Sequence, residues 1–382
     1  MCKFAATYRC AAPRGVVWPY RIGNMSTNRL QYIERLRFPL ACCVVLIHCA
    51  NSVWREALCE QSSLWEVLMY WLSHSLPSFA VPLFFALSGY LFFLRPTVWN
   101  GQVYFKKLER RVFTLLVPYL CWNLLACALY AVQARASGLP WPLGNSLVHV
   151  FWGYRELRGA TFNAFGFPLE ATLAPAQIPL WFVRDLMLLV IVSPLLRWLL
   201  RHAAWPFLAL VGTAYYLELW PCYGGVTLTG LWYFSLGAWF GVRGLDPLHH
   251  LGRLSRLALP TAVLLLVALA CLPEGFWYSV AQALYVLAAM LAAAVLAQRP
   301  VHGSRRLQWL AASSFFVYAS HTIVLFPLSR VLAGFVAPLG PAASFAAYLL
   351  CLPLTVGLCL AAYALLTKSL PRAAWLLTGG RK

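Results

Sequence analysis

The chain has 382 residues, of which 62% are hydrophobic and only 11% are charged, whereas a soluble globular chain carries about a quarter charged residues. This balance excludes an ordinary soluble domain. The formal net charge of +19 raises the question of nucleic acid, but the basic residues form no stripe within a recognisable nucleic-acid motif. We therefore expect a membrane protein in contact with lipid and without a nucleic-acid partner.

Ten long apolar runs follow one another along the chain, each with roughly the length that crosses a hydrocarbon core as a helix. They begin at Phe38, Val81, Val112, Pro179, Ala203, Val226, Leu257, Phe276, Ala311 and Ala342. The alternation of apolar and polar residues that a membrane β-barrel requires is not apparent in the sequence. The runs predict an all-α integral membrane protein, a single bundle of about ten transmembrane helices.

The basic residues divide unequally between the two sides of this predicted bundle. If residue 1 is placed in the cytosol, 24 of the 30 Lys and Arg fall in inner segments, five fall in outer segments, and Arg184 falls inside a span. Cytoplasmic loops of membrane proteins carry an excess of Lys and Arg. The asymmetry predicts that both termini are cytosolic and explains the basic charge as a matter of topology.

Three parts are expected along the chain. Residues 1–35 form a basic cytosolic segment. Residues 1–24 lack the apolar core of a cleaved signal peptide, and Met25 is an alternative start. Residues 36–368 form the transmembrane domain, and 369–382 a basic cytosolic tail. The outer loop 133–177 is long and rich in aromatics, which fits a functional loop and an interfacial cap equally well.

The first span carries the polar residues that we consider first for chemistry. His48 is expected near the middle of the membrane, and Arg37 eleven residues earlier at the cytosolic mouth. Eleven steps of about 100° place both on one helix face. An imidazole suits proton transfer from a hydroxyl and to a thiolate, and a guanidinium suits phosphate. The ordinary alternative for His48 is a polar contact between helices.

Other polar residues lie inside or beside later spans. His321 is expected at a depth similar to that of His48 and is a partner or packing residue when taken alone; together they suit a base and a substrate-positioning group. Trp181, Arg184 and Asp185 lie near the outer start of the fourth span. Buried ion pairs are more often structural than functional, so the structural interpretation is favoured there.

The twelve cysteines show no C-x-x-C pair and lie mostly inside apolar runs, so they are interpreted as small hydrophobic residues. His249 and His250 lie beside Asp246, which is a weak signal for a metal. No metal site is therefore expected.

Six segments, in this order, resemble the acyltransferase-3 family of membrane O-acyltransferases. They are 34–52 (ERLRFPLACCVVLIHCANS), 81–96 (VPLFFALSGYLFFLRP), 106–122 (KKLERRVFTLLVPYLCW), 178–196 (IPLWFVRDLMLLVIVSPLL), 231–241 (LWYFSLGAWFG) and 313–330 (SSFFVYASHTIVLFPLSR). The first carries the Arg and His of the family as Arg37 and His48, and the last carries its Tyr and His as Tyr318 and His321. Members of the family often show two arginines three apart in the inner loop, where this chain has Lys107 and Arg110.

The resemblance implies a bacterial, multi-pass enzyme of the cytoplasmic membrane. It implies transfer of a short acyl group, such as acetyl, from cytosolic acyl-coenzyme A to a hydroxyl of a cell-envelope glycan or lipid-linked saccharide, with no permanently bound cofactor. His48 becomes the expected general base, acting with Arg37. Lys107, Arg110 and Arg111 become the expected ligands of the coenzyme A phosphates.

Two other functional classes compete with this interpretation. A transporter or flippase of a glycan intermediate or small solute is one, with His48, His321, Arg184 and Asp185 lining its path, although internal repeats with broken helices are not clear in the sequence. A structural component of a polysaccharide assembly is the other. The sequence predicts no particular acyl chain, acceptor or oligomeric state.

Overall fold

The computed structural model describes residues 25–59, 63–94, 99–138, 150–153, 163–164, 167–168, 174–217, 227–273, 275–298 and 305–380. The regular secondary structure of these residues is helical apart from one antiparallel pair of two-residue strands, β1 (Asn163–Ala164) and β2 (Phe167–Pro168). This confirms the predicted all-α class. Residues 1–24, which make up most of the predicted N-terminal segment, and most of the predicted outer loop lie outside the described residues.

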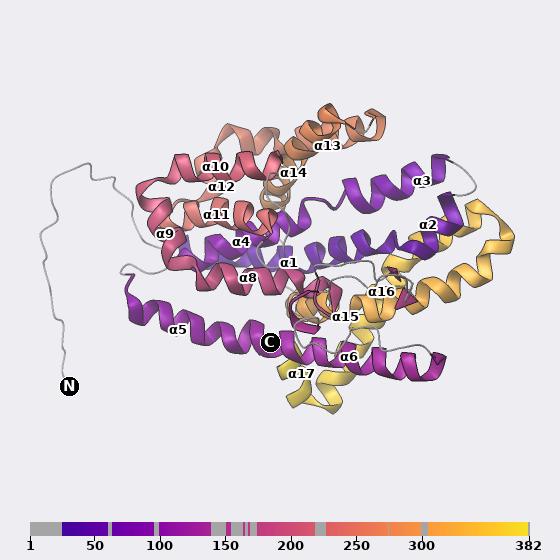
Figure 1. Cartoon of the computed structure of the whole chain (residues 1–382). Coiled ribbons are helices and arrows are strands. Elements are labelled where there is room, and N and C mark those ends of the chain that lie inside the picture. The colour runs from indigo at the N-terminus through magenta and orange to yellow at the C-terminus, as the bar shows by residue number, and fades with distance from the viewer. Residues whose placement is uncertain are drawn as a thin grey trace, which may run out of the picture.

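The first half of the chain gives α1 and α4 through the centre of Figure 1 and α5 and α6 along its lower edge. Its elements are α1 (Met25–Cys49), α2 (Ser52–Cys59), α3 (Ser63–Tyr70), the π-helical turn η1 (Trp71–Ser75), α4 (Ala80–Phe93), α5 (Gly101–Arg111), the π-helical turn η2 (Val112–Leu116) and α6 (Val117–Ser137). The helix that carries the second apolar run therefore begins well before Val81, at Ser63. Single π-helical turns inside α-helices are often found near functional sites.

The second half begins after the outer loop. Its elements are η3 (Ile178–Leu180), α8 (Trp181–Ile191), α9 (Ser193–His202), α10 (Ala204–Tyr216), α11 (Leu228–Arg243), α12 (Pro247–Leu251), α13 (Arg253–Cys271), α14 (Phe276–Ala297), α15 (Arg305–Val336), η4 (Ala337–Leu339), α16 (Pro341–Ser369) and α17 (Pro371–Thr378). All ten predicted apolar runs are thus helical.

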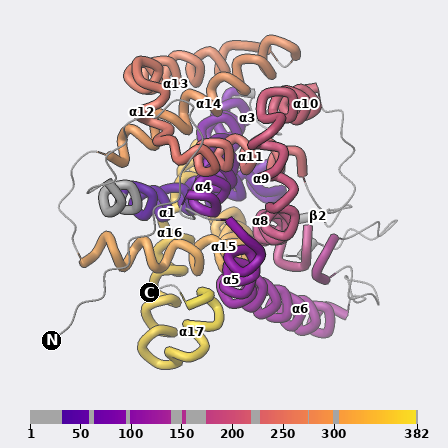
Figure 2. The backbone as a smooth tube through the Cα atoms, turned by 90° about the vertical axis from the view of Figure 1, so that its left-hand side faces the viewer, coloured from indigo at the N-terminus to yellow at the C-terminus, as the bar shows by residue number. Residues whose placement is uncertain are grey.

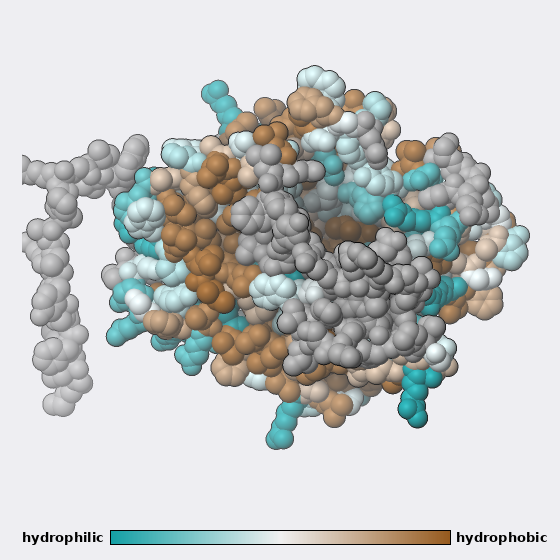
Figure 3. Space-filling model, viewed as in Figure 1, coloured by the Kyte–Doolittle hydropathy of each residue, from teal (hydrophilic) through white to brown (hydrophobic). Residues whose placement is uncertain are grey.

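Six helical segments among the described residues are long and apolar enough to cross a membrane, and two bent pairs raise that number to eight. The bent pairs are α1 with α2, which turns by 55°, and α8 with α9, which turns by 65°. The two other predicted runs form α10 and α11, which have only 13 and 16 residues. Apolar side chains of α8 to α10 gather on the outer surface of the molecule (Figure 3), as expected for helices that face lipid.

The bend between α8 and α9 has a local cause. Pro194 stands in the first turn of α9, where its missing N–H and its ring interrupt the hydrogen-bond ladder that would otherwise continue from α8. Because of this break, α9 leaves the direction of α8 and lies at the same end of the bundle as the start of α5 (Figure 1).

Helices α4 and α11 form the closest contact in the centre of the bundle, which Figure 2 shows end-on. Gly89 of α4 and Gly237 and Gly241 of α11 lie at this contact; a Cβ atom on Gly237 would lie 1.9 Å from the Ala86 carbonyl oxygen. Only glycine permits such an approach of two backbones. The spacing of Gly237 and Gly241, four residues apart, therefore serves packing.

Candidate active site

The two histidines of the first and ninth apolar runs face each other. The rings of His48 on α1 and His321 on α15 have their centroids 5.1 Å apart and are tilted by 42°. Fully buried apolar residues lie one helical turn from each histidine, Val45 on α1 and Val317 and Leu325 on α15. Residues three or four apart share a helix face, so this apolar packing holds the two imidazoles together.

Main-chain geometry fixes the protonation pattern of His321. Its Nδ1 lies 2.6 Å from the carbonyl oxygen of Tyr318, and since a carbonyl only accepts, Nδ1 carries the hydrogen and donates it. In the neutral ring, Nε2 is then the unprotonated acceptor. The side chain is fully buried, and Nε2 has no hydrogen-bond partner among the described residues.

His48 lies in the last turn of α1, just before the bend into α2, and is only partly buried. A third histidine, His74 of η1, lies close enough to His48 for their charges to interact. Sequence analysis missed His74 because it lies ahead of the predicted start of the second run at Val81.

The basic residues predicted for the inner side gather between the end of α5, which carries Lys107, Arg110 and Arg111, and the middle of α1, which carries Arg37. Arg37 and Arg111 lie close enough for their charges to repel each other, and Lys107 interacts in the same way with Arg110 and Arg111. Helix α1 runs without a break from Arg37 to His48. Eleven residues at 1.5 Å each separate them by about 16 Å along the axis.

Arg197 and Trp99, which the sequence analysis did not single out, lie beside this basic group. The guanidinium carbon of Arg197, on α9, lies 5.1 Å from the centre of the Trp99 ring, and the Lys107 Nζ lies 5.8 Å from the same ring and 4.9 Å from that of Phe92. The bend between α8 and α9 brings Arg197 to this place. No local sequence pattern connects Arg197 with α5, so only the fold reveals it.

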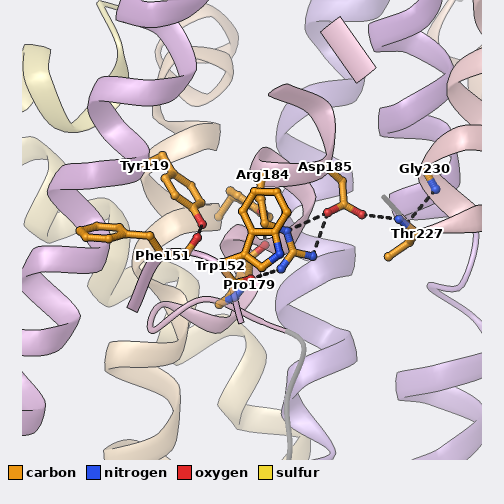
Figure 4. A network of polar contacts seen from close by, with 9 residues as sticks. Tyr119, Phe151, Trp152, Pro179, Arg184, Asp185, Thr227 and Gly230 are labelled. Carbon is orange, nitrogen blue, oxygen red and sulfur yellow. Dashed lines mark hydrogen bonds and ion pairs between the residues drawn. The ribbon is translucent and has the colours of Figure 1, made fainter. Parts of the chain in front are cut away.

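Arg184 and Asp185 form a buried ion pair at the start of α8 (Figure 4). The Asp185 Oδ1 accepts from Arg184 Nε at 3.0 Å and Nη2 at 2.9 Å, while its Oδ2 accepts from the backbone N–H of Thr227 at 2.9 Å. The Thr227 hydroxyl in turn accepts from the Gly230 N–H and caps α11. Arg184 also donates to the Trp152 carbonyl. The pair thus joins α8, α11 and residue 152.

Residues around the ends of the outer loop are held by buried side chains. The Tyr119 hydroxyl donates to the Phe151 carbonyl (Figure 4). None of the sequence motifs includes Gln177. Its side-chain nitrogen donates to the Ala319 carbonyl at 2.6 Å and to the Thr322 hydroxyl at 2.9 Å. Gln177 therefore attaches the start of the fourth span to the same part of α15 that carries His321.

The other predicted residues of this region pack between helices. The Tyr318 hydroxyl donates to the Pro179 carbonyl, and its ring lies 6.1 Å from that of Phe182. The Trp181 ring lies 6.1 Å from that of Phe85 on α4. The described residues contain no group of three or more His, Cys, Asp or Glu placed to hold a metal ion.

The fold and the site define a multi-pass helical membrane protein with paired histidines between two long helices, α1 and α15, and a basic group formed by α5 and the middle of α1. The acyltransferase domain of the acyltransferase-3 family matches residues 30–364. The chain therefore belongs to the acyltransferase-3 family of membrane acyltransferases.

A relative gives a more particular comparison. The chain is similar to the succinoglycan biosynthesis protein ExoH of Rhizobium meliloti (strain 1021), with 30% identity over 266 residues. The similarity covers 67% of this chain and 64% of that protein, so the chain spans less than two thirds of the length of the relative. No solved structure shows a significant match.

Proposed function

We propose that this protein is a membrane O-acyltransferase that moves a short acyl group, in the first place acetyl, from cytosolic acyl-coenzyme A to a hydroxyl of a cell-envelope glycan. The observation that carries the proposal is the contact between His48 and His321, 5.1 Å from ring to ring, in a chain of the acyltransferase-3 family. Two imidazoles between apolar helices provide proton-transfer groups in a place where charges are otherwise costly.

The reaction follows from the chemistry of a hydroxyl and a thioester. His48 removes the proton of the acceptor hydroxyl as its oxygen attacks the thioester carbonyl carbon. The C–S bond then breaks, and the proton passes from the His48 imidazolium to the leaving thiolate. The products are an ester on the acceptor and free coenzyme A, so protons and electrons balance without a further reactant.

His321 suits a positioning role beside this base. Its Nδ1–H is bonded to the Tyr318 carbonyl, so Nε2 is directed as a hydrogen-bond acceptor in the neutral ring. That nitrogen can accept from a hydroxyl or from the His48 ring. A fully buried acceptor without a partner among the described residues is costly, and a bound acceptor hydroxyl would relieve that cost.

The donor is proposed to enter from the inner side, where Arg37, Lys107, Arg110 and Arg111 gather. Guanidinium groups bind phosphates through charge-assisted hydrogen bonds. Arg37 lies about 16 Å along α1 from His48, a separation that the flexible pantetheine arm of coenzyme A is suited to bridge. Phosphates held beside Arg37 would thus leave the thioester beside His48.

The acceptor is proposed to approach from the outer side, where the predicted outer loop joins α6 and α8. Support for a glycan comes from the relative ExoH, a succinoglycan biosynthesis protein. The same proposal includes ten spans, both termini in the cytosol, and the cytoplasmic membrane of a bacterium. In that arrangement α10 and α11 cross as short helices within the bundle, next to α9 and α4.

Acyl transfer from radiolabelled acetyl-coenzyme A into membrane glycan or lipid tests the proposal. Cells with the native chain, with His48→Ala and with His202→Ala are compared at equal protein levels in the membrane. His202 is an exposed histidine on α9, so we expect its variant to keep the label while His48→Ala loses it. Label that survives His48→Ala removes His48 as the base, and absence of protein-dependent label with any acyl donor favours a transporter.

A further inference from the structure

Basic side chains lie over aromatic rings at one place in the structure, which we call the Trp99 cluster. It consists of Phe92, Trp99, Lys107, Arg111 and Arg197. The Trp99 ring lies 5.9 Å from the ring of Phe92 and 5.2 Å from that of Phe93, both of which are buried. The Arg111 guanidinium lies 6.0 Å from the Phe92 ring. Cations within about 6 Å of an aromatic ring are attracted to its face.

Local contacts hold the parts of the Trp99 cluster in place. Asn100, directly after Trp99, caps α5 by accepting from the Val103 N–H at 2.9 Å. The Tyr104 hydroxyl donates to the Ile191 carbonyl at the end of α8 at 2.9 Å. Lys107 donates to the Phe92 carbonyl. Helix α5, which directly follows Trp99 and Asn100, is therefore attached to the end of α8 and to α4 by side-chain contacts.

The charges of the Trp99 cluster point to an anionic ligand. Its cations repel one another and their neighbours: Lys107 and Arg111 interact unfavourably, as do Arg111 with Arg37 and Arg197 with Arg201. The ion pair between Arg184 and Asp185 includes none of these cations. Partly buried cations gathered in this way are stabilised when phosphate binds.

The aromatic part of the cluster distinguishes one phosphate ligand from another. A lipid head group offers phosphate without an aromatic ring, whereas a nucleotide offers phosphate together with a purine. Purines stack on aromatic side chains and on the plane of an Arg guanidinium. The Arg197 guanidinium, 5.1 Å from the Trp99 ring, provides both kinds of surface at one place.

We infer that the Trp99 cluster binds the adenosine-phosphate end of the acyl donor, with Arg197 and Trp99 as the residues that select a nucleotide-bearing thioester over one without a nucleotide. The inference rests on the proposed function, since it assigns to two further residues the recognition of the donor named there. It adds Arg197 of α9, over the Trp99 ring, to the basic residues of α1 and α5.

A series of shortened donors tests the inference with the purified protein in lipid nanodiscs. Acetyl-coenzyme A, acetyl-3′-dephospho-coenzyme A and S-acetyl-pantetheine are compared for kcat/KM with the native chain and with Arg197→Ala, Arg197→Lys and Trp99→Leu. Arg243→Ala is the matched control, since Arg243 also lies over a tryptophan ring, that of Trp239, at 5.4 Å. Its removal deletes the same kind of contact on α11.

We expect Arg197→Ala to lower kcat/KM for acetyl-coenzyme A by about tenfold, the loss of one charged hydrogen bond, and to leave S-acetyl-pantetheine unaffected. Arg197→Lys and Trp99→Leu should give smaller losses with the same donor dependence, and Arg243→Ala none. An equal loss with all three donors would mean that Arg197 acts on the fold or on the chemical step and would overturn the inference. Equal use of all three donors by the native chain would overturn it as well.

Equilibrium binding of radiolabelled coenzyme A to the same nanodiscs separates this inference from the proposed function. Binding that Arg197→Ala weakens supports the cluster as a nucleotide site even if no acyl transfer is detected. Unchanged coenzyme A binding, with loss of anionic phospholipid from Arg197→Ala in native mass spectrometry, would identify a lipid head-group site and overturn the inference. The binding of coenzyme A is measured in nanodiscs of neutral lipid and in nanodiscs of anionic lipid, so that a nucleotide site and a lipid head-group site can be told apart.

Discussion

The side chain and the backbone of Tyr318 act at two different places: its hydroxyl donates to the carbonyl of Pro179 at the start of the fourth span, and its carbonyl accepts from His321. Only the backbone contact touches the proposed site. We therefore expect Tyr318→Phe, which leaves that carbonyl in place, to lower thermal stability while kcat changes little. The loss should be about 1–3 kcal/mol, because the buried Pro179 carbonyl is left without this donor.

Thermal unfolding in detergent and acyl-transfer rates of Tyr318→Phe provide the measurement. A fall in kcat comparable with that of a histidine variant, at unchanged stability, would show that the phenol itself takes part in the reaction.

Replacing His321 should act on the chemical step. In His321→Asn the acceptor nitrogen is lost, so we expect kcat to fall by about 10²-fold, the lower end of general acid–base contributions, with the KM for the donor unchanged. Ser320→Ala on the same helix is the control, since the Ser320 hydroxyl bonds to the Phe316 carbonyl at 2.7 Å. Steady-state kinetics of both variants decide; a change confined to the donor KM would contradict the role given to His321.

Replacing Arg37 should act on donor binding. Arg37→Gln removes one cation from the inner group, and the loss of one charge-assisted hydrogen bond, about 1.5–3 kcal/mol, raises the KM for acetyl-coenzyme A by about 10- to 100-fold. Arg37→Lys keeps the charge but lacks the planar guanidinium, so its KM should lie between those of the native protein and Arg37→Gln. Donor titrations check the order of the three proteins. A glutamine variant with native KM and reduced kcat would place Arg37 in the chemical step.

Glycine at the α4–α11 contact should be indispensable for stability. In Gly237→Ala the new Cβ atom would lie 1.9 Å from the Ala86 carbonyl oxygen, so the two backbones must separate at a cost of at least about 3 kcal/mol, the upper end for overpacking. Gly357→Ala on α16 is the control, because a Cβ there meets no atom within 4 Å and alanine favours a helix by about 1 kcal/mol. Thermal unfolding of the two variants should move in opposite directions.

The Arg184–Asp185 pair should be structural. Arg184→Met leaves a buried carboxylate without its partner and is expected to cost about 3–5 kcal/mol, whereas Arg184→Met with Asp185→Asn removes the charge and should recover part of that loss. Unfolding measurements on the single and double variants compare the two. If both are equally unstable, the carboxylate is not the source of the loss, and the contact of Arg184 with the Trp152 carbonyl is the better explanation.

Much of the fold could be predicted from apolar length alone, because a helix that crosses lipid must be long and continuous. The ten runs are all helical for this reason. The bends were harder to predict. Helices α1 and α2 form one apolar run in the sequence, and the Asn51 side chain between them donates to the hydroxyl of Ser329 at 2.9 Å. Because Ser329 is far away in the sequence, no local pattern reveals this contact. The short α10 and α11 also follow from packing within the bundle, which run length does not reveal.

The candidate site could be predicted only as separate polar residues. His48 and Arg37 share a helix, so the helical repeat relates them directly. The contact of His48 with His321 depends on how α1 and α15 pack, and the approach of Arg197 to Trp99 depends on the break before α9. Neither relationship has a local signal. His74 was hidden because an apolar run gives the start of a helix poorly.

The glycine contact between α4 and α11 has a consequence for movement during a catalytic cycle. Two backbones that touch without side chains between them cannot slide past one another by changing rotamers, so α4 and α11 should travel as one rigid body. The hinges of the molecule are then the two breaks with the largest turns, 55° between α1 and α2 and 65° between α8 and α9. The first adjoins His48 and the second lies a few residues before Arg197, so opening and closing at either end of the site can occur while the centre stays fixed.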